Sequence, residues 1–386
     1  MNPNPNPKPN PKPNPNPNPQ ASTNIKKYGW NAHWEALLPP SDDNARGLSP
    51  ARVIAQHSHS YQLMTESGEH TASVSGKYAY TAAHPSDFPA VGDWVLTEPM
   101  PGESRSVIHA LLPRRSAMLR RAAGNIDVEQ VIGANIDYLF ITSALNQDFN
   151  VRRIERYLIA AWESGATPVV LLTKADLCED PESLRAQVEH AAPGVPVHFV
   201  SALLDQGMEQ LSPYMRPGAT IAVTGSSGVG KSTLLNWLAG ESRMTTSGIR
   251  ESDARGRHTT THRELFVLPG GALVMDTPGM RELQLWDSQE GWQHAFADIE
   301  ALAANCRYRD CRHEAEAGCA VLEAISGGEL EAGRLANYKK TGRELAHQAR
   351  KETRSAGKQQ ASKSAKAAKS STRSSKPSRY YADDLD

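Results

Sequence analysis

The chain has 386 residues, of which 39% are hydrophobic, and a formal net charge of −1 at pH 7. This length suits two or three domains with cores of their own. No apolar run approaches the roughly 20 residues that a membrane-spanning helix needs, and the N-terminus lacks the apolar centre of a signal peptide. Three of the four cysteines lie close together beside a histidine, which favours metal binding in a reducing cytoplasm over a disulfide framework.

Residues 1–47 are predicted to be a disordered leader. Proline occupies every odd position from Pro3 to Pro19, and this spacing excludes helices and sheet ladders. The repeat is therefore expected to be an extended, solvated spacer, with a recognition role as the less favoured alternative. The stretch from about Gln20 to Leu48 carries no pattern that assigns it to an element.

Residues 48–116 contain short β-type segments separated by turn residues. Five such strands in about sixty residues favour a small barrel of the oligonucleotide/oligosaccharide-binding (OB) kind, which would contact RNA or the ribosome. A β domain without a ligand is the alternative. The expected strands are residues 52–55, 61–64, 70–74, 93–96 and 106–109. A basic patch follows, which either contacts phosphate or is a solvated surface: Arg114, Arg115, Arg120 and Arg121.

Apolar strands alternate with amphipathic helices over residues 130–287. This alternation predicts an α/β domain with a parallel sheet covered by helices on both faces. Its ligand should bind at the carboxyl ends of the strands. The expected strands are residues 137–142, 169–173, 197–200, 219–224 and 272–275, and the expected helices are 151–164 and 231–238.

A phosphate-binding loop is the strongest motif in this domain. The pattern G-x-x-x-x-G-K-[ST] is matched where a buried strand leads into a helix, as such a loop requires and a chance glycine-rich turn would not. Its glycines let backbone N–H groups face phosphate, its lysine would contact the β- and γ-phosphates, and Ser232 would offer a hydroxyl to Mg²⁺. The predicted nucleotide-binding residues here are Gly225, Ser226, Ser227, Gly228, Val229, Gly230, Lys231, Ser232 and Thr233.

Two later segments are predicted to sense the γ-phosphate. In the sequence from Asp276 to Gly279 (Asp-Thr-Pro-Gly), the carboxylate would hold Mg²⁺ through water and the Gly279 N–H would contact the γ-phosphate. Upstream, in residues 257–261, Thr260 is the favoured second Mg²⁺ ligand, and a polar exposed loop is the alternative.

The residue that would activate the attacking water is not identified. Met280 stands where many GTPases carry a glutamine, so slow intrinsic hydrolysis is expected unless a partner or a switch residue completes the site. The candidates within the chain are His258, His262 and Thr260.

A guanine-reading loop is predicted at residues 173–176 (Thr-Lys-Ala-Asp). Asp176 would accept the N1–H and N2 amino donors of guanine, and the stem of Lys174 would pack on the purine face. Adenine would leave this carboxylate desolvated and unpaired, at a cost of roughly 1–3 kcal/mol. Thr173 stands where asparagine is usual. Ser201 and Ala202 are expected to support the base through main-chain N–H groups.

Residues 288–342 are predicted to form a zinc-binding domain. The spacing Cys306-x4-Cys311-x-His313-x5-Cys319 supplies three thiolates and one imidazole, which suits a closed tetrahedral structural Zn²⁺ site. Free cysteines near a chance histidine are the alternative. Interleaved arginines make the same segment basic and suited to phosphate.

Residues 343–386 are predicted to be a disordered basic tail. Eleven Lys and Arg residues face only two glutamates between Arg343 and Arg379. Flexible basic arms can bind RNA by releasing phosphate counterions.

The order of these motifs is unusual, because the guanine-reading loop precedes the phosphate loop. With this order the chain resembles the RsgA family (also called YjeQ or YloQ) of ribosome small-subunit-dependent GTPases over about residues 48–340. The resemblance rests on the motifs at residues 173–176, 225–233, 256–261 and 276–279 and on the cysteine/histidine set.

The resemblance implies a circularly permuted P-loop GTPase domain between an N-terminal OB-like barrel and a C-terminal helical zinc-binding domain. It implies a monomeric cytoplasmic factor in late assembly of the 30S subunit, with GTP hydrolysis stimulated by that subunit and GTP-dependent docking on 16S rRNA. Structural Zn²⁺ and Mg²⁺ with GTP are the implied cofactors. Two rival hypotheses are a P-loop kinase, for which Asp176 would have no purpose, and a passive RNA-binding scaffold.

Overall fold

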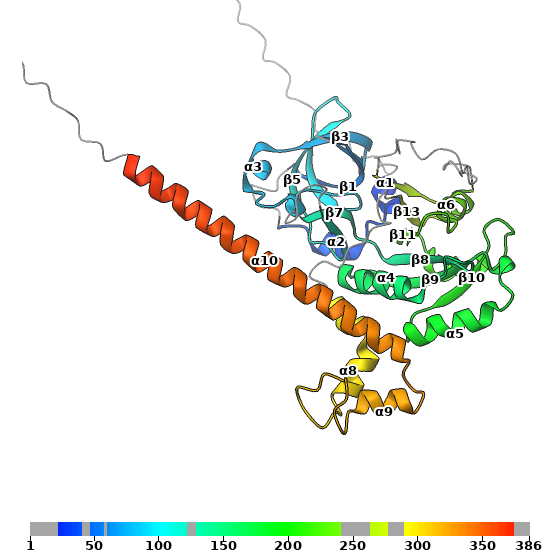
Figure 1. The fold of residues 1–386 in the computed structure, drawn as a ribbon. Helices are drawn as coiled ribbons and strands as arrows, with labels where there is room; N and C mark the ends of the chain where they lie inside the picture. The colour runs from blue at the N-terminus through cyan, green and yellow to red at the C-terminus, as the bar shows by residue number, and fades with distance from the viewer. Residues whose placement is uncertain are drawn as a thin grey trace, which may run out of the picture.

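The computed structural model describes residues 22–40, 47–57, 60–121, 129–240, 263–276 and 289–373. A β-barrel and an α/β domain lie side by side, and a small helical module lies beside the α/β domain (Figure 1). A long C-terminal helix runs from that module past the barrel and away from the body (Figure 1). Of the helices within the described ranges, none has the length and apolarity needed to cross a membrane.

The barrel has the five strands that the sequence predicts. They follow the order β1-β2-β3-β5-β4, and β4 also pairs with β1, which closes the barrel. Alternate side chains point inward and bury Val53, Leu63 and Ile108 in its core. The strands are β1 (Ser49–Gln56), β2 (Tyr61–Thr65), β3 (Gly68–Val74), β4 (Trp94–Pro99) and β5 (Arg105–Leu111), with α3 (Gly76–Thr81) and a 3-10 helix (Pro85–Asp87) between β3 and β4.

The N-terminal segment corrects the predicted leader. Residues 22–40 contain the helices α1 (Ser22–Lys27) and α2 (Ala32–Ala36), so the disordered leader predicted for residues 1–47 does not extend over them. Trp34 is buried, and its ring centroid lies 6.1 Å from that of Trp94 in β4. A few large apolar side chains therefore hold this segment against the barrel, although they show no helical or strand period.

The α/β domain is built on a sheet in the order β10-β9-β8-β11-β13-β12. All neighbours pair in parallel except β12, which is antiparallel to β13. The alternation of buried side chains gives the sheet two apolar faces, each covered by helices, as expected. The strands are β8 (Tyr138–Ala144), β9 (Thr167–Thr173), β10 (Val197–Val200), β11 (Thr220–Gly225), β12 (Arg263–Val267) and β13 (Leu273–Asp276); the helices are α4 (Val151–Ser164), α5 (Pro181–Ala191) and α6 (Lys231–Ala239), with 3-10 helices at Ala175–Leu177 and Met208–Tyr214.

The barrel and the α/β domain share one continuous sheet. Strand β1 of the barrel pairs with β12 of the α/β domain, with Ala55 opposite Glu264 and Gln56 opposite Arg263. The resulting sheet has 11 strands. A separate hairpin of β6 (Ala117–Arg121) and β7 (Glu129–Ala134) leads from the barrel to β8. The two domains are thus joined by backbone hydrogen bonds as well as by the chain.

Arg114, one member of the predicted basic patch, is held in a partly buried ion pair. Arg114 forms an ion pair with the fully buried Asp93, with its Nε 2.9 Å from Oδ1 and its Nη2 2.8 Å from Oδ2. It also donates to the carbonyls of Ser86 and Phe88. These contacts leave little of its guanidinium for phosphate, so Arg114 stabilises the barrel. Arg115 is exposed.

The C-terminal module contains four helices and corrects the predicted tail. These are α7 (Gln289–Ala295), α8 (Ala297–Ala303), α9 (Ala320–Ser326) and α10 (Ala332–Arg373). Helix α10 runs through residues 343–373, which were expected to be disordered. Its composition is rich in Ala, Lys, Arg and Gln, which are good helix formers, and its first turns are anchored by the buried Leu335.

A buried ion network joins this module to the α/β domain. Arg334 in α10 is 1% exposed and donates to Glu155 in α4 at 2.8 Å and to Asp298 in α8 at 2.7 Å. Glu155 also accepts from Asn337. Glu155 also pairs with the partly exposed Arg152 at 3.1 Å. Each charge in the network is therefore compensated, and removing Arg334 would leave two carboxylates with less compensation in a buried site.

We expect Arg334→Met to lower the free energy of unfolding by about 3–5 kcal/mol, because it removes the buried cation that Glu155 and Asp298 share. Denaturant titration measures the effect. Arg343→Met is the matched control, since Arg343 is exposed on the same helix. Equal stability of the two variants would contradict the prediction.

Candidate functional site

The predicted phosphate loop lies at the carboxyl end of β11 and opens α6. Gly225, Gly228 and Gly230 have φ values of 146°, 77° and 99°, which side chains rarely adopt. A Cβ atom at Gly225 would also lie 2.3 Å from the Thr142 Oγ1 atom of β8. The backbone can therefore turn over the end of the sheet with its N–H groups available to an anion.

Lys231 folds back over this loop. Its Nζ donates to the Gly225 carbonyl at 2.8 Å and to the Ser226 carbonyl. These acceptors hold the ammonium group above the loop that would receive the phosphates. Ser232 and Thr233 follow in the first turn of α6.

A residue that sequence reasoning missed also positions the phosphate loop. Asp148, in the loop after β8, accepts from the Ser226 hydroxyl at 2.6 Å and forms an ion pair with Arg153 at 2.7 Å. The hydrogen bonds from Arg153 and then from Ser226 lower the pKa of Asp148. The only signal in the sequence is that the loop is polar and ends at the helix cap Asn150.

The predicted guanine loop is bonded directly to the phosphate loop. The Thr173 hydroxyl donates to the Val229 carbonyl at 2.7 Å, and the Lys174 Nζ donates to the Gly228 carbonyl at 2.8 Å. Lys174 itself has a φ of 58°, a costly conformation for a side-chain-bearing residue that is found at functional sites. The threonine hydroxyl thus ties the two loops together in place of a side-chain amide, and Asp176 stands exposed beside them.

A third loop completes this side of the site. Ser201 and Gln206 exchange backbone hydrogen bonds, and Asp205 accepts from the indole N–H of Trp237 in α6 at 2.8 Å. Ala202 and Leu203 lie within this closed turn, and Leu203 is 81% exposed.

Asp276, the first residue of the predicted segment Asp276–Gly279, is the last residue of β13. Asp276 lies opposite Glu264 of β12 in the sheet register. Burial, followed by the negative charge of Glu264, raises the pKa of Asp276 to about 6. The predicted switch residues His258, Thr260, His262 and Gly279 lie outside the described residues.

We expect the affinity for Mg·GTP to fall as the pH drops below about 6. In the folded, nucleotide-free protein the raised pKa keeps the Asp276 carboxyl protonated below about pH 6, and the carboxylate predominates as the pH rises through 6. A cation at Asp276 needs the carboxylate, so the proton competes with it. Nucleotide titrations from pH 5 to 7.5 measure this effect. In Asp276→Asn the affinity should vary with pH only through the ionisation of the nucleotide. An identical pH profile in the variant and the unaltered protein would contradict the assignment.

The predicted metal ligands come together in the C-terminal module. The ligand atoms of Cys306, Cys311, His313 and Cys319 all lie within 4.8 Å of one another, and such a group could hold a metal ion. The Sγ of Cys306 is 3.9 Å from the Sγ of Cys319 and 3.6 Å from the Nδ1 of His313. Tetrahedral Zn²⁺ with ordinary bond lengths places two sulfurs about 3.8 Å apart and a sulfur and a nitrogen about 3.6 Å apart. The donor set and its spacing therefore fit zinc.

The local environment favours the ligating protonation states of His313 and Cys306, whereas burial raises the pKa of Cys311 to about 11. Burial and the nearby Lys339 lower the pKa of His313, which keeps its imidazole neutral. Burial of the Cys306 thiol opposes its ionisation, but backbone N–H groups of Val321 and Ala320 lower the pKa of Cys306 overall. These N–H groups belong to the start of α9, so the fold supplies the partial positive charge that a thiolate needs.

The fold and the site together define the class of the protein. The guanine loop after β9 and the phosphate loop after β11 are adjacent in space, yet they occur in the chain in the reverse of the usual order. This is a circularly permuted P-loop GTPase. The family model described as RsgA GTPase matches residues 111–286, and the relatives below match most of the chain. The chain belongs to the RsgA family of GTPases.

The similarity extends beyond the GTPase domain. The chain is 46% identical over 325 residues to the small ribosomal subunit biogenesis GTPase RsgA 2 of Lactiplantibacillus plantarum, which covers 84% of this chain and 90% of that relative. It is 44% identical to the RsgA of Opitutus terrae over 85% of this chain and 91% of that one. The crystal structure of YjeQ from Thermotoga maritima superposes with a TM-score of 0.59 at 25% identity, covering 78% of this chain and 99% of that chain.

Proposed function

We propose that this protein is a cytoplasmic GTPase that acts in the biogenesis of the small ribosomal subunit. It would bind the 30S subunit through 16S rRNA as a monomer, hydrolyse GTP slowly alone and hydrolyse it faster on the subunit. The names of relatives that are more than 40% identical over most of the chain support the ribosomal role. The bonded guanine and phosphate loops support the choice of GTP.

In this proposal, Mg²⁺ and Zn²⁺ bind to separate sets of residues. Ser232, Thr260 and Asp276 would hold Mg²⁺ with GTP, and the ion would neutralise charge on the phosphates. The cysteine/histidine cluster would hold one structural Zn²⁺ that organises the loop before α9. Lys231 would bind the β- and γ-phosphates, and Gly279 would contact the γ-phosphate.

One observation supports coupling between the nucleotide and the barrel. Strand β12 follows the predicted switch segment that contains Thr260, and β13 ends at Asp276, where the second switch begins. β12 pairs with β13 along one edge and with β1 of the barrel along the other. A rearrangement of the switches on hydrolysis would therefore act on a strand that is hydrogen-bonded to the barrel.

The turnover of GTP by purified, zinc-loaded protein tests this function. We expect slow hydrolysis of GTP alone, a many-fold acceleration by 30S subunits, and no turnover of ATP. Turnover that is indifferent to 30S subunits would contradict the ribosomal part of the proposal and leave the GTPase part intact.

The variant Lys231→Ala separates a switch from a passive scaffold. It removes the charge that binds the β- and γ-phosphates, so a switch should lose turnover and its cellular role while the fold persists. A folded variant that restores normal subunit assembly in cells lacking the protein would favour the scaffold.

A further inference from the structure

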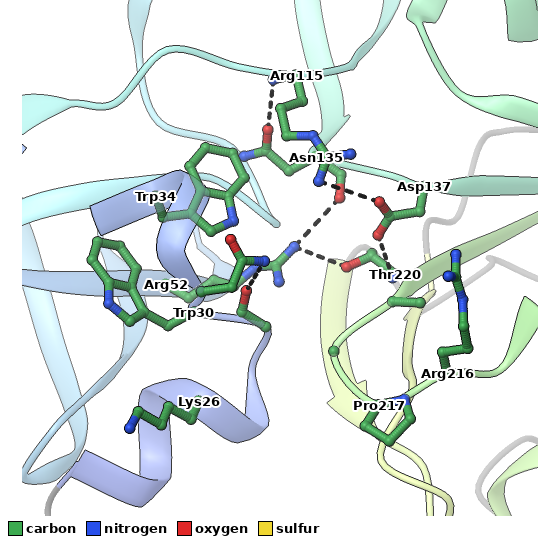
Figure 2. A pocket seen from close by; sticks show the side chains of 14 residues that line it. Lys26, Trp30, Trp34, Arg52, Arg115, Asn135, Asp137, Arg216, Pro217 and Thr220 are labelled. Carbon is green, nitrogen blue, oxygen red and sulfur yellow. Dashed lines mark hydrogen bonds and ion pairs between the residues drawn. The ribbon is translucent and has the colours of Figure 1, made fainter. Parts of the chain in front are cut away.

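A polar cavity of about 400 Å³ lies at the edge of the sheet opposite the nucleotide site. It opens where α1, the barrel strand β1 and the start of β11 meet, as Figure 2 shows. Thr220, at its wall, is the first residue of β11, whose last residue is Gly225 of the phosphate loop. The cavity is therefore one strand length away from the GTP site and separate from it.

The lining of this cavity is strongly cationic. Four basic side chains face a single lining carboxylate, Asp137. That carboxylate already accepts the Thr220 N–H at 2.8 Å and lies 3.5 Å from the Arg115 guanidinium. The basic lining residues are Lys26, Arg52, Arg115 and Arg216. The local excess of positive charge favours an anionic occupant.

Arg52 is the central and most buried of these cations. It is 2% exposed and donates to the Thr220 hydroxyl at 2.9 Å and to the carbonyls of Gly92, Asn135 and Tyr28. All of these acceptors are neutral, and burial lowers the pKa of Arg52 to about 10. Its charge is thus solvated by dipoles but not neutralised within contact distance, which an anion in the cavity would change.

The walls of the cavity are preformed. Gly29 has a φ of 91°, and a Cβ atom there would lie 2.7 Å from the Gly218 carbonyl, so two backbones meet at this wall. The indoles of Trp30 and Trp34 lie on the side away from Asp137 and Arg216 (Figure 2). The volume is within the usual range for small-ligand sites. Trp34 is buried, but the indole of Trp30 is partly exposed and suits a planar ring that carries a phosphate.

We propose that this cavity binds a small phosphorylated ligand with an aromatic ring, of the nucleoside monophosphate class. The exposed side chains of Lys26 and Arg216 would hold the phosphate. The buried charge of Arg52 would attract it from behind, because the Arg52 N–H groups already donate within the protein, and the ring would lie toward Trp30. Such a ligand would connect the N-terminal helices to the first residue of the strand that carries the phosphate loop.

Calorimetric titration of AMP into the full-length protein, saturated with Mg²⁺ and GDP, tests this site. AMP lacks the donor pair that the guanine loop reads, and GDP blocks the known phosphate loop. We expect one AMP to bind per chain, and the double variant Lys26→Gln/Arg216→Gln to weaken it at least tenfold. Both side chains are exposed, so the fold should persist. The double variant Lys27→Gln/Arg105→Gln, which removes two exposed charges that do not line the cavity, should bind AMP normally.

Four results would overturn the proposal. The first is the absence of saturable binding of AMP, and the second is equal binding by both double variants. The third is binding of a short single-stranded RNA that is lost in Lys26→Gln/Arg216→Gln while AMP does not bind, which would make the cavity an RNA contact. The fourth is loss of the AMP signal when the GDP concentration is raised further, which would assign that signal to the GTP site.

Discussion

Replacing Asp176 with asparagine is expected to change the preferred nucleotide from GTP to XTP. The carboxylate is predicted to accept two hydrogen bonds from guanine, and each charge-assisted bond contributes about 1.5–3 kcal/mol. An amide keeps one acceptor but places an N–H group against the guanine amino group. GTP affinity should therefore fall by roughly ten- to a hundredfold for each bond lost. Xanthine carries a carbonyl at that position and can accept the new N–H.

Competition of GDP, XDP and ADP against a fluorescent nucleotide measures this change. Glu179→Gln is the matched control, because Glu179 is an exposed acid three residues further along the chain. The control should keep the preference for guanine. Since Asp176 is exposed in the structure, the substitution should not alter stability. A variant that loses GDP without gaining XDP, or that binds ADP as well as before, would show that another residue reads the base.

Replacing Cys319 with serine is expected to release zinc and unfold the loop that precedes α9. Structural zinc sites in small peptides contribute about 10–16 kcal/mol of apparent binding free energy at neutral pH. Residues 304–318 here are turns and bends without a regular helix or strand, so the metal would supply most of their order. Cys319 is buried at the start of α9, and its loss removes a ligand that no neighbouring side chain replaces among the described residues.

Zinc content and limited trypsin digestion measure this effect. We expect the purified variant to lose its zinc and to be cleaved at least tenfold faster at Arg307, Arg309 or Arg312. Chelation of zinc from the unaltered protein should reproduce the faster cleavage. Cys178→Ser, outside the cluster, is the control and should retain the metal. Full zinc content in Cys319→Ser, or cleavage that is insensitive to a chelator, would contradict the structural role.

The features that the sequence predicted are local ones. The phosphate loop was recognised because Gly225, Gly228 and Gly230 are needed at fixed positions for a backbone with positive φ. The metal cluster was recognised because ligand types and spacing along a short segment determine which ion can be held. Strands and helices of the barrel and the α/β domain followed from apolar periodicity, which depends only on neighbouring residues.

The features that only the tertiary structure decided depend on contacts between distant residues. Thr173 and Val229 are bonded although 56 positions separate them, and β1 pairs with β12 although more than 200 residues separate them in the chain. The contact of Trp34 with Trp94 and the cavity around Arg52 also join residues that are far apart in the chain.

Residues 22–40 and 343–373, where the structure corrects the prediction, show why local features were predicted and long-range contacts were not. Residues 22–40 show no helical or strand period, and α10 is basic and polar, yet buried side chains hold residues 22–40 and the first part of α10 in place. Local composition reports the conformational preference of a segment but not the surface that it meets after folding. The sequence by itself therefore determined the class of site and the order of its motifs. Packing between distant elements decided how the loops are joined, how the barrel is coupled to them, and where the cationic cavity lies.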